Sequence, residues 1–248
     1  MTAQKRILEQ PAFILHHRPF RDSSQILDVI SSDHGKLALV ARGSRGARSR
    51  LKGVLRPFMP LAISWVQRSD LGTLTGAEVR GAPIALSGDA LLSGYYVNEL
   101  LLHFLHRHDP QPGIFAIYAR TIEALAATDR IAACLRQFEI ELLRQLGYAL
   151  NLDHESDSYD PLQRDRHYEY RFEQGPVRVQ RSSGALVFSG AQLLAIGEQR
   201  FEEPDILRAA SRLLREAIGF HLGGKEIKSR RVLLDLHRGR AARAARRQ

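Results

Sequence analysis

The sequence predicts an α+β protein in which an amino-terminal five-stranded β-barrel is followed by a mainly helical region. Over roughly the first eighty residues, short apolar runs alternate with clusters of turn-forming residues, which is typical of β-strands. From Leu86 onward, apolar residues recur at helical spacing over longer segments. A weakly alternating stretch at 168–181, around Gly175 and Pro176, predicts a small β-hairpin inserted into the helical region.

The strands of the barrel are expected at five places. The apolar runs cover 12–16, 26–30, 37–41, 61–66 and, more weakly, 71–79. Five short strands with a long third connection favour a closed barrel, and the OB-fold is the commonest barrel of this size. An SH3-like barrel fits the same pattern.

Helices are expected after residue 86. The predicted segments are 87–105, 114–127, 130–147, 189–196, 204–220 and 227–236. Ser87 is the expected N-cap of the first helix, and Gly147 ends the third. We therefore predict an OB-fold domain at 1–82 and a helical domain at 83–248. The second of these includes an insertion at 151–188 and a basic tail at 238–248.

The charge balance is basic. The chain has 36 Lys and Arg against 27 Asp and Glu, which gives a formal net charge of +9 at pH 7. Such a field attracts polyanions, so nucleic acid or an acidic protein is the expected partner. More than half of the excess lies in the tail at 238–248, which contains five arginines and no acid. The tail is interpreted either as a solvated end or as a flexible arm that contacts phosphates.

Cysteine content and hydropathy predict a cytoplasmic protein. Cys134 is the only cysteine, so the chain has no intrachain disulfide and no four-cysteine zinc site. Residues 1–10 are polar and lack the apolar core of a signal peptide. No run approaches the roughly 18 consecutive apolar residues that a membrane-spanning helix needs.

Patterns typical of enzymes are not met. The segment at 219–226 has the spacing of a phosphate-binding loop, but Glu226 stands where a magnesium-binding Ser or Thr is required, and a helical pattern precedes it. His103, His106 and His108 crowd the end of a predicted helix, where such side chains also suit the helix dipole. We therefore predict no enzymatic activity, no cofactor and no bound metal.

The segment at 42–52, R-G-S-R-G-A-R-S-R-L-K, is the most distinctive part of the barrel region. It holds five basic residues and no acid, and a sixth basic residue follows. The six are Arg42, Arg45, Arg48, Arg50, Lys52 and Arg56. The glycines and serines predict a mobile loop whose backbone can also approach phosphates. A basic loop on a five-stranded barrel is typical of sequence-tolerant DNA binding. The nearby aromatic residues Phe20, Phe58 and Trp65 are candidates for stacking on bases, and each could equally belong to the core. A solvated surface loop is the alternative.

In their order along the chain, these features resemble the bacterial recombination mediator RecO family. The resemblance is carried by A-F-I-L-H-H-R-P-F-R-D-S-S at 12–24, G-K-L-A-L-V-A-R-G-S-R at 35–45 and L-K-G-V-L-R-P-F-M-P-L at 51–61. It continues through Y-Y-V-N-E-L-L at 95–101, L-R-Q-F-E-I-E-L-L-R-Q-L-G-Y at 135–148 and H-L-G-G-K-E-I-K-S-R-R at 221–231. Each piece is short, but together they cover nearly the whole chain.

The resemblance implies an OB-fold, a helical domain and, in many members, a small zinc-ribbon-like insertion. It also implies binding of single- and double-stranded DNA, annealing of complementary strands and a location at the nucleoid. The implied protein partners are the acidic tail of single-stranded-DNA-binding protein (SSB) and RecR, with which the family loads the RecA recombinase. The four cysteines of zinc-binding members are missing between 151 and 188, so this insertion is expected to fold without metal.

The resemblance implies two further sites. A second basic DNA-binding surface is expected from Lys225, Lys228, Arg230 and Arg231. The SSB tail is expected to bind at Leu135, Arg136, Phe138 and Leu142, with Arg120. A carboxylate-binding arginine beside an apolar groove suits an acidic, apolar peptide. The alternative for Arg136 is a surface ion pair with Glu139 or Glu141.

The predicted function is therefore a non-enzymatic recombination mediator. It would anneal complementary strands and help load recombinase on SSB-coated single-stranded DNA during recombinational repair. One alternative is an adaptor that recognises acidic peptide tails and binds DNA only incidentally. Another is an RNA-binding barrel protein of translation, which the composition equally allows.

Overall fold

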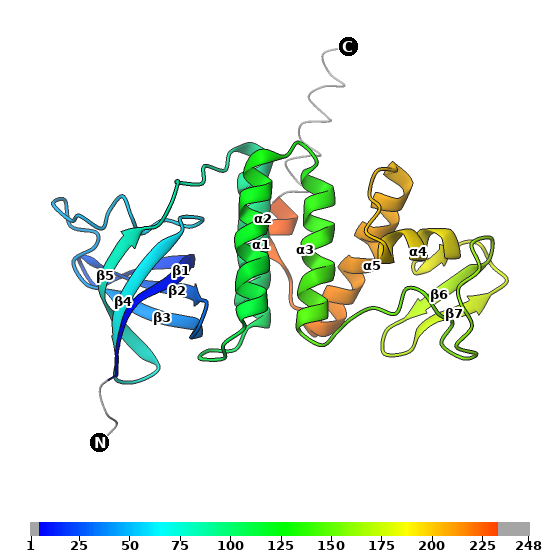
Figure 1. Ribbon diagram of the computed structural model, residues 1–248, viewed down its shortest axis with the longest axis horizontal. Helices are drawn as coiled ribbons and strands as arrows, with labels where there is room; N and C mark the ends of the chain where they lie inside the picture. The colour runs from blue at the N-terminus through cyan, green and yellow to red at the C-terminus, as the bar shows by residue number, and fades with distance from the viewer. Residues whose placement is uncertain (1–4, 233–248) are drawn as a thin grey trace, which may run out of the picture. The chain divides into compact units, whose positions relative to one another are not determined.

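The computed structural model describes residues 5–232 and confirms the predicted α+β class (Figure 1). The chain forms two compact units. One, which we call the barrel unit, contains the described residues up to Asp129 and those from Ile227 to Val232. The other, which we call the insertion unit, contains Arg130–Glu226. The first two helices are thus grouped with the barrel, whereas the predicted boundary at 82–83 follows the change from strands to helices.

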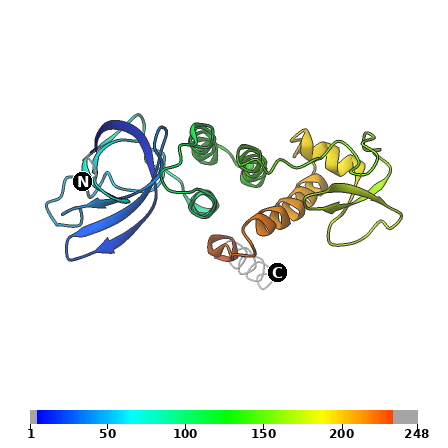
Figure 2. The same ribbon diagram turned by 90° about the horizontal axis from the view of Figure 1, so that it is seen from below.

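The amino-terminal region is a closed five-stranded barrel, as predicted for an OB-fold. Its strands are β1 (Lys5–Phe20), β2 (Ser24–Ser31), β3 (Gly35–Ala41), β4 (Leu61–Gln67) and β5 (Leu71–Val79). They are hydrogen-bonded in the order β1-β2-β3-β5-β4, and Figure 2 shows how they curl around a common axis. The β3–β5 pair is parallel and the other pairs are antiparallel.

The barrel interior is filled by alternate residues of the strands, which exclude water from its centre. Its buried core includes Leu27, Val29, Leu37, Leu39, Ile63, Trp65 and Leu74. Strand β5 has the weakest sequence pattern because glycines interrupt it. At Gly72 a Cβ atom would lie 2.7 Å from the Leu39 Cδ2 atom, so a larger residue does not fit where β5 closes the barrel against β3.

Strand β1 is longer than the apolar run that predicted it. Its first half, from Lys5 to Ala12, pairs with β4, and its second half, from Ala12 to Phe20, pairs with β2. A register shift between Ile14 and His16 accompanies the pairing with β2. The polar residues at both ends of β1 belong to the strand because of this pairing rather than burial, so an apolar pattern does not reveal them.

Two helices follow the barrel within the barrel unit. They are α1 (Gly88–Phe104) and α2 (Pro112–Ala127). Ser87 occupies the N-cap position of α1, as predicted, but its side chain makes no capping hydrogen bond. Pro112 lies in the first turn of α2, where proline removes no helical hydrogen bond.

Aromatic contacts and two consecutive buried hydrogen bonds, which we call the polar chain, join these helices to β1. The Phe13 ring packs edge-on against Tyr118, with the ring centroids 5.1 Å apart. The Asn98 side-chain amide donates a hydrogen bond of 2.8 Å to the Leu15 carbonyl oxygen. The Tyr118 hydroxyl in turn donates to Asn98 Oδ1 at 2.8 Å. Asn98 therefore connects one barrel strand to both helices.

The insertion unit combines three helices with a small sheet. The elements are α3 (Ile131–Gln145), β6 (His167–Arg171), β7 (Gly175–Val179), β8 (Val187–Ser189), α4 (Gly190–Gly197) and α5 (Pro204–His221). The predicted hairpin is present as β6 and β7, and β8 joins it to give an antiparallel sheet in the order β7-β6-β8. A capping box between Ser189 and Gln192 begins α4 directly after β8.

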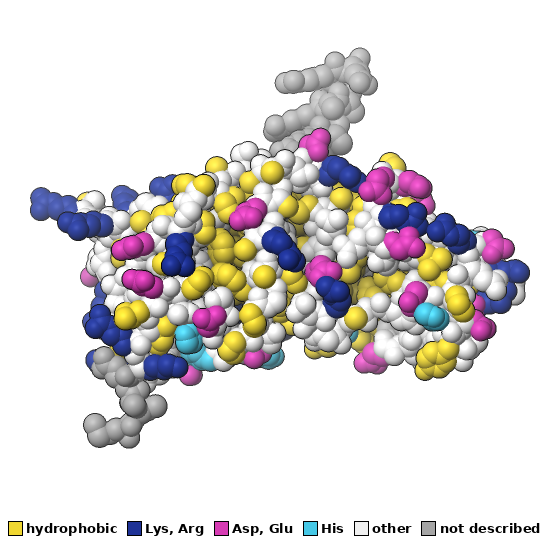
Figure 3. All heavy atoms as spheres, in the orientation of Figure 1, with side chains coloured by type: hydrophobic (Ala, Val, Ile, Leu, Met, Phe, Trp, Pro, Cys, Tyr) yellow, Lys and Arg dark blue, Asp and Glu magenta, His cyan; other side chains and the backbone are white. Residues whose placement is uncertain are grey.

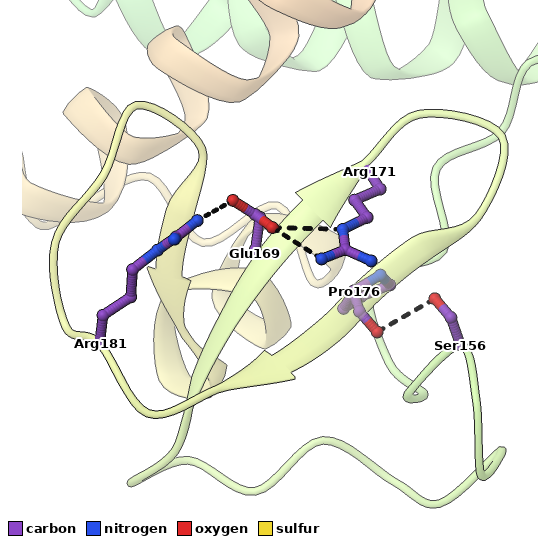
Figure 4. A network of polar contacts seen from close by, with 5 residues as sticks. All are labelled: Ser156, Glu169, Arg171, Pro176 and Arg181. Atoms are coloured by element: carbon purple, nitrogen blue, oxygen red, sulfur yellow. Dashed lines mark hydrogen bonds and ion pairs between the residues drawn. The ribbon is translucent and has the colours of Figure 1, made fainter.

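Polar contacts tie the hairpin to its neighbouring loops (Figure 4). The Glu169 carboxylate on β6 receives hydrogen bonds from the guanidinium groups of Arg171, at 3.0 Å, and Arg181. The Ser156 hydroxyl donates to the Pro176 carbonyl oxygen at 3.0 Å, and the Ser156 amide bonds to the same oxygen. Within residues 5–232, no group of three His, Cys, Asp or Glu side chains is placed to hold a metal ion. Hydrogen bonds thus connect the parts of this insertion.

The carboxy-terminal part of the chain is described only as far as Val232. The predicted helix at 227–236 is helical from 228 to 232, and its remainder lies outside the described residues. The predicted tail at 238–248, with Arg238, Arg240, Arg243, Arg246 and Arg247, also lies outside them. None of the helices formed by the described residues combines the length and apolar character needed to cross a membrane.

Candidate nucleic-acid interface

The basic loop between β3 and β4 is anchored to the barrel at several points. Near its start, the Ser44 hydroxyl donates to the Ala41 carbonyl oxygen at 2.8 Å, and Ser44 is buried. The Arg45 amide donates to the Ser23 carbonyl oxygen, also at 2.8 Å. Near its end, Leu55 enters the barrel core. The sequence predicted a mobile loop, but apolar residues between the cations, together with these hydrogen bonds, give the loop defined attachments.

All six predicted cations of this loop are exposed. They are Arg42, Arg45, Arg48, Arg50, Lys52 and Arg56. Among the residues that the structure describes, none of the six has an acidic partner within ion-pair distance. Figure 3 shows Lys and Arg side chains projecting at the end of the barrel where this loop lies in Figure 1. Such a group of uncompensated charges is suited to binding a polyanion.

The aromatic side chains near the loop differ in their exposure. Trp65 is 1% exposed and Phe58 is 4% exposed, so both belong to the core and have no free face for a base. Phe20 is half-buried, and the guanidinium carbon of Arg21 lies 5.2 Å from its ring centroid. Of the three candidates for base stacking, Phe20 alone keeps accessible surface.

A second group of basic residues surrounds Asp28, and no sequence pattern marks it. The Asp28 carboxylate lies 3.7 Å from His16 Nδ1 and 4.0 Å from an Arg18 guanidinium nitrogen. A guanidinium nitrogen of Arg107, from the connection between α1 and α2, lies 3.9 Å from it. Strand pairing places His16 opposite Asp28. Arg107 is distant in sequence, so only the packing of α1 and its following turn on the barrel brings it to this group.

The second predicted basic surface is divided between the two units. Lys225 belongs to the insertion unit, whereas Lys228, Arg230 and Arg231 belong to the barrel unit. Lys225, Lys228 and Arg231 are exposed, and Arg230 is half-buried. A single surface formed by all four residues therefore remains a prediction.

Glu99 on α1 holds the start of the carboxy-terminal helical segment. Its carboxylate accepts hydrogen bonds from the Lys228 amide at 2.9 Å, the Ser229 amide at 2.8 Å and the Ser229 hydroxyl at 2.5 Å. Burial by itself would raise the pKa of the Glu99 carboxyl, but the bonds from Ser229 and Lys228, together with nearby His103, lower it below its usual value. Glu99 thus acts as a cap supplied by another helix.

Replacing Glu99 with glutamine is expected to destabilise the 228–232 segment by about 1 kcal/mol at neutral pH, because the charged cap is lost. A lowered folded-state pKa means that the stabilisation is complete above the usual carboxyl pKa, near 4.3, and disappears as the pH falls through the lower folded value. Amide exchange of Lys228–Val232 measured against pH tests this prediction. The parent and E99Q should differ at pH 7 and converge in acid, while Glu123→Gln on an exposed position of α2 should match the parent throughout.

The predicted peptide-binding residues of α3 are mainly interior. Leu135, Phe138 and Leu142 are 8%, 1% and 0% exposed. The Arg136 guanidinium is hydrogen-bonded to the Glu139 carboxylate and is only 11% exposed, which is the ion-pair alternative that the sequence allowed. Arg120 is exposed, but it lies on α2 in the other unit. Peptide binding at these residues therefore remains a prediction.

An open hollow of about 390 Å³ lies elsewhere in the insertion unit. Its lining comes from α3, the loop after it and α4, and includes Ile140, Arg144, Leu150, Leu152 and Leu194. None of the α3 residues predicted to bind a peptide is part of it. Three separate segments form the hollow, so no local sequence pattern marks it.

Comparison with known proteins decides the family. The family description "Recombination protein O N terminal" matches residues 5–82, and "Recombination protein O C terminal" matches 86–231. This chain belongs to the RecO family. It is 41% identical over 240 residues to the DNA repair protein RecO of Dechloromonas aromatica, covering 95% of this chain and 99% of that protein.

Other RecO proteins show the same extent of similarity. The DNA repair protein RecO of Aromatoleum aromaticum is 42% identical over 237 residues, covering 95% of this chain and 99% of that protein. The DNA repair protein RecO of Nitrosococcus oceani is 39% identical over 234 residues, covering 94% of this chain and 95% of that protein. The resemblance found in the sequence is therefore confirmed. Membership of the RecO family implies that this protein interacts with DNA and has a role in recombinational repair.

Proposed function

We propose that this RecO protein anneals complementary DNA strands and helps load recombinase on SSB-coated single-stranded DNA, without a chemical step of its own. The supporting observation is the anchored loop between β3 and β4, with six exposed cations that have no acidic partner among the described residues. Cations that neutralise phosphates on two strands reduce the repulsion between the strands. Because the loop is anchored, less conformational entropy is lost when it binds.

The proposal includes the SSB acidic tail and RecR as protein partners, and action at the nucleoid in the cytoplasm. Among the residues predicted to bind the SSB tail, Arg120 is directly accessible. Arg136 would have to exchange its Glu139 partner for a peptide carboxylate. Such an exchange keeps the guanidinium paired, but it takes this partner from the Glu139 carboxylate, whose side chain is 1% exposed, so the peptide contacts must offset that cost.

The test is annealing of two complementary oligonucleotides coated with SSB. The parent is compared with a loop variant in which Arg42, Arg45, Arg48, Arg50 and Lys52 are alanine. A control variant loses the same charge from exposed arginines of the insertion unit, namely Arg164, Arg166, Arg200, Arg208 and Arg215. Annealing by the parent and the control, but not by the loop variant, is the expected result. If the parent binds SSB tightly but does not anneal the strands, the adaptor function replaces the proposal.

A further inference from the structure

The two arginines beside Asp28 carry more charge than this one carboxylate can neutralise. Three side chains, those of His16, Arg18 and Arg107, share this one carboxylate. Each distance lies between 3.7 and 4.0 Å, beyond the 2.7–3.2 Å of an N–H···O hydrogen bond, so the donors of the two guanidinium groups remain available. The side chains of His16, Arg18 and Arg107 are 54%, 53% and 45% exposed, whereas that of Asp28 is 13% exposed. The outer surface of this group is therefore cationic, and the less exposed Asp28 carboxylate lies beneath it.

Lys36 lies beside this group but is already engaged. Its ammonium donates to the Leu102 carbonyl oxygen at 2.7 Å. The pKa of Lys36 lies below its usual value, because burial and the charge of Arg107 lower it by more than the Asp28 carboxylate raises it. This lysine joins β3 to the end of α1 and thereby supports the turn that holds Arg107. It is part of the scaffold rather than of the exposed surface.

The group continues into the basic loop along the β1–β2 hairpin. Residues of a strand alternate between its faces, so His16, Arg18 and Phe20 project on one side of β1. From His16 to Phe20 the strand extends about 13 Å, which equals the axial rise of about four nucleotides of a B-form strand. Arg21 follows at the turn, and the Arg45 guanidinium donates to its carbonyl oxygen at 3.4 Å. The loop therefore contacts the turn at the end of the hairpin.

We propose that the phosphate backbone of DNA follows a path from the 42–56 loop across the β1–β2 hairpin to Arg107, with Arg18 and Arg107 as phosphate contacts and Phe20, between Arg18 and the loop, as a base-stacking position. We call this surface the hairpin path. It deepens the proposed function and rests on it. Exposed guanidinium donors with one shared, recessed acid match the charge of a phosphate chain, and a half-buried aromatic ring among cations suits an unpaired base.

The variant that tests the hairpin path has Arg18 and Arg107 replaced by alanine. Binding of a fluorescent oligothymidylate is measured by anisotropy over a series of salt concentrations. Each lost contact to a single strand lowers the slope of log affinity against log salt by about 0.7, so the expected decrease is about 1.4. At about 0.1 M salt this corresponds to roughly 20-fold weaker binding. The matched control replaces the exposed Arg164 and Arg166 of the insertion unit and should keep the parent's slope.

The Asp28→Asn variant is expected to change DNA affinity in the opposite direction. Removing this negative charge from beneath the path should tighten binding about threefold at low salt, because phosphates no longer face its repulsion. A purely structural role for Asp28 would instead leave affinity unchanged or weaken it. Thermal unfolding of each variant shows whether the fold is retained, which is expected because exposed ion pairs contribute little to stability.

The outcomes separate this inference from the proposed function. An unchanged salt slope in the Arg18/Arg107 variant, together with lost binding in the loop variant, overturns the hairpin path and leaves the proposed function standing. Normal DNA binding by both variants removes the barrel surface from the proposed function as well. If the Arg18/Arg107 variant loses binding of an acidic peptide but keeps its DNA slope, the surface binds protein, and the inference is also overturned.

Discussion

A variant with Arg42, Arg45, Arg48, Arg50 and Lys52 replaced by alanine is expected to bind single-stranded DNA about 3 × 10³-fold more weakly than the parent at about 0.1 M salt. The physical reason is counterion release, which lowers the salt slope by about 0.7 for each phosphate contact that is lost. Five lost contacts would reduce the slope by about 3.5. These side chains are exposed and have no acidic partner among the described residues, so little of their charge is neutralised within the protein.

The same variant should remain folded. The anchors of the loop are the Ser44 hydroxyl, the Arg45 backbone amide and the buried Leu55 side chain, and all three are retained. Thermal unfolding near the parent's midpoint is therefore the expected control result. The five-arginine control in the insertion unit changes the net charge equally and should keep the parent's salt slope. A shallow slope in the parent itself, equal to that of the loop variant, would contradict electrostatic binding by this loop.

Replacing Asn98 with leucine is expected to destabilise the barrel unit by about 2–4 kcal/mol, because two buried groups lose their partner. Asn98 is 2% exposed and links the Leu15 carbonyl oxygen to the Tyr118 hydroxyl. Burial raises the pKa of Tyr118, although the hydrogen bond to Asn98 lowers it, so the phenol stays neutral at physiological pH and needs an acceptor. Leucine has a similar volume but offers neither a donor nor an acceptor.

Chemical denaturation of the parent, Asn98→Leu, Tyr118→Phe and the double variant measures this effect. Tyr118→Phe removes only the hydroxyl and should cost about 1 kcal/mol. In the double variant the Tyr118 hydroxyl is no longer left without a partner, so the total cost should be smaller than the sum of the single effects. An Asn98→Leu variant as stable as the parent would show that this polar chain does not hold the helices on the barrel.

The parts of the fold that the sequence predicted well depend on local patterns. The barrel strands and helices were found because apolar residues repeat with period two or at helical spacing, and burial of one face enforces those repeats. The ends of β1 were missed because their pairing with β2 and β4 needs no apolar alternation. The third strand of the small sheet, β8, is not part of the predicted hairpin, because three residues contain too little pattern to show which strand they pair with.

For the candidate site too, some features follow from the local sequence and others only from contacts between distant segments. The sequence by itself determined the family, the barrel and the location of the basic loop, because a run of charges contiguous in the chain stays together in the fold. The tertiary structure decided which side chains are accessible: Trp65 is core while Phe20 is partly exposed, and Arg136 is paired with Glu139. It also brought Arg107 to Asp28. Burial and the choice of ionic partner depend on contacts between segments far apart in the chain, and no local pattern of residues encodes those contacts.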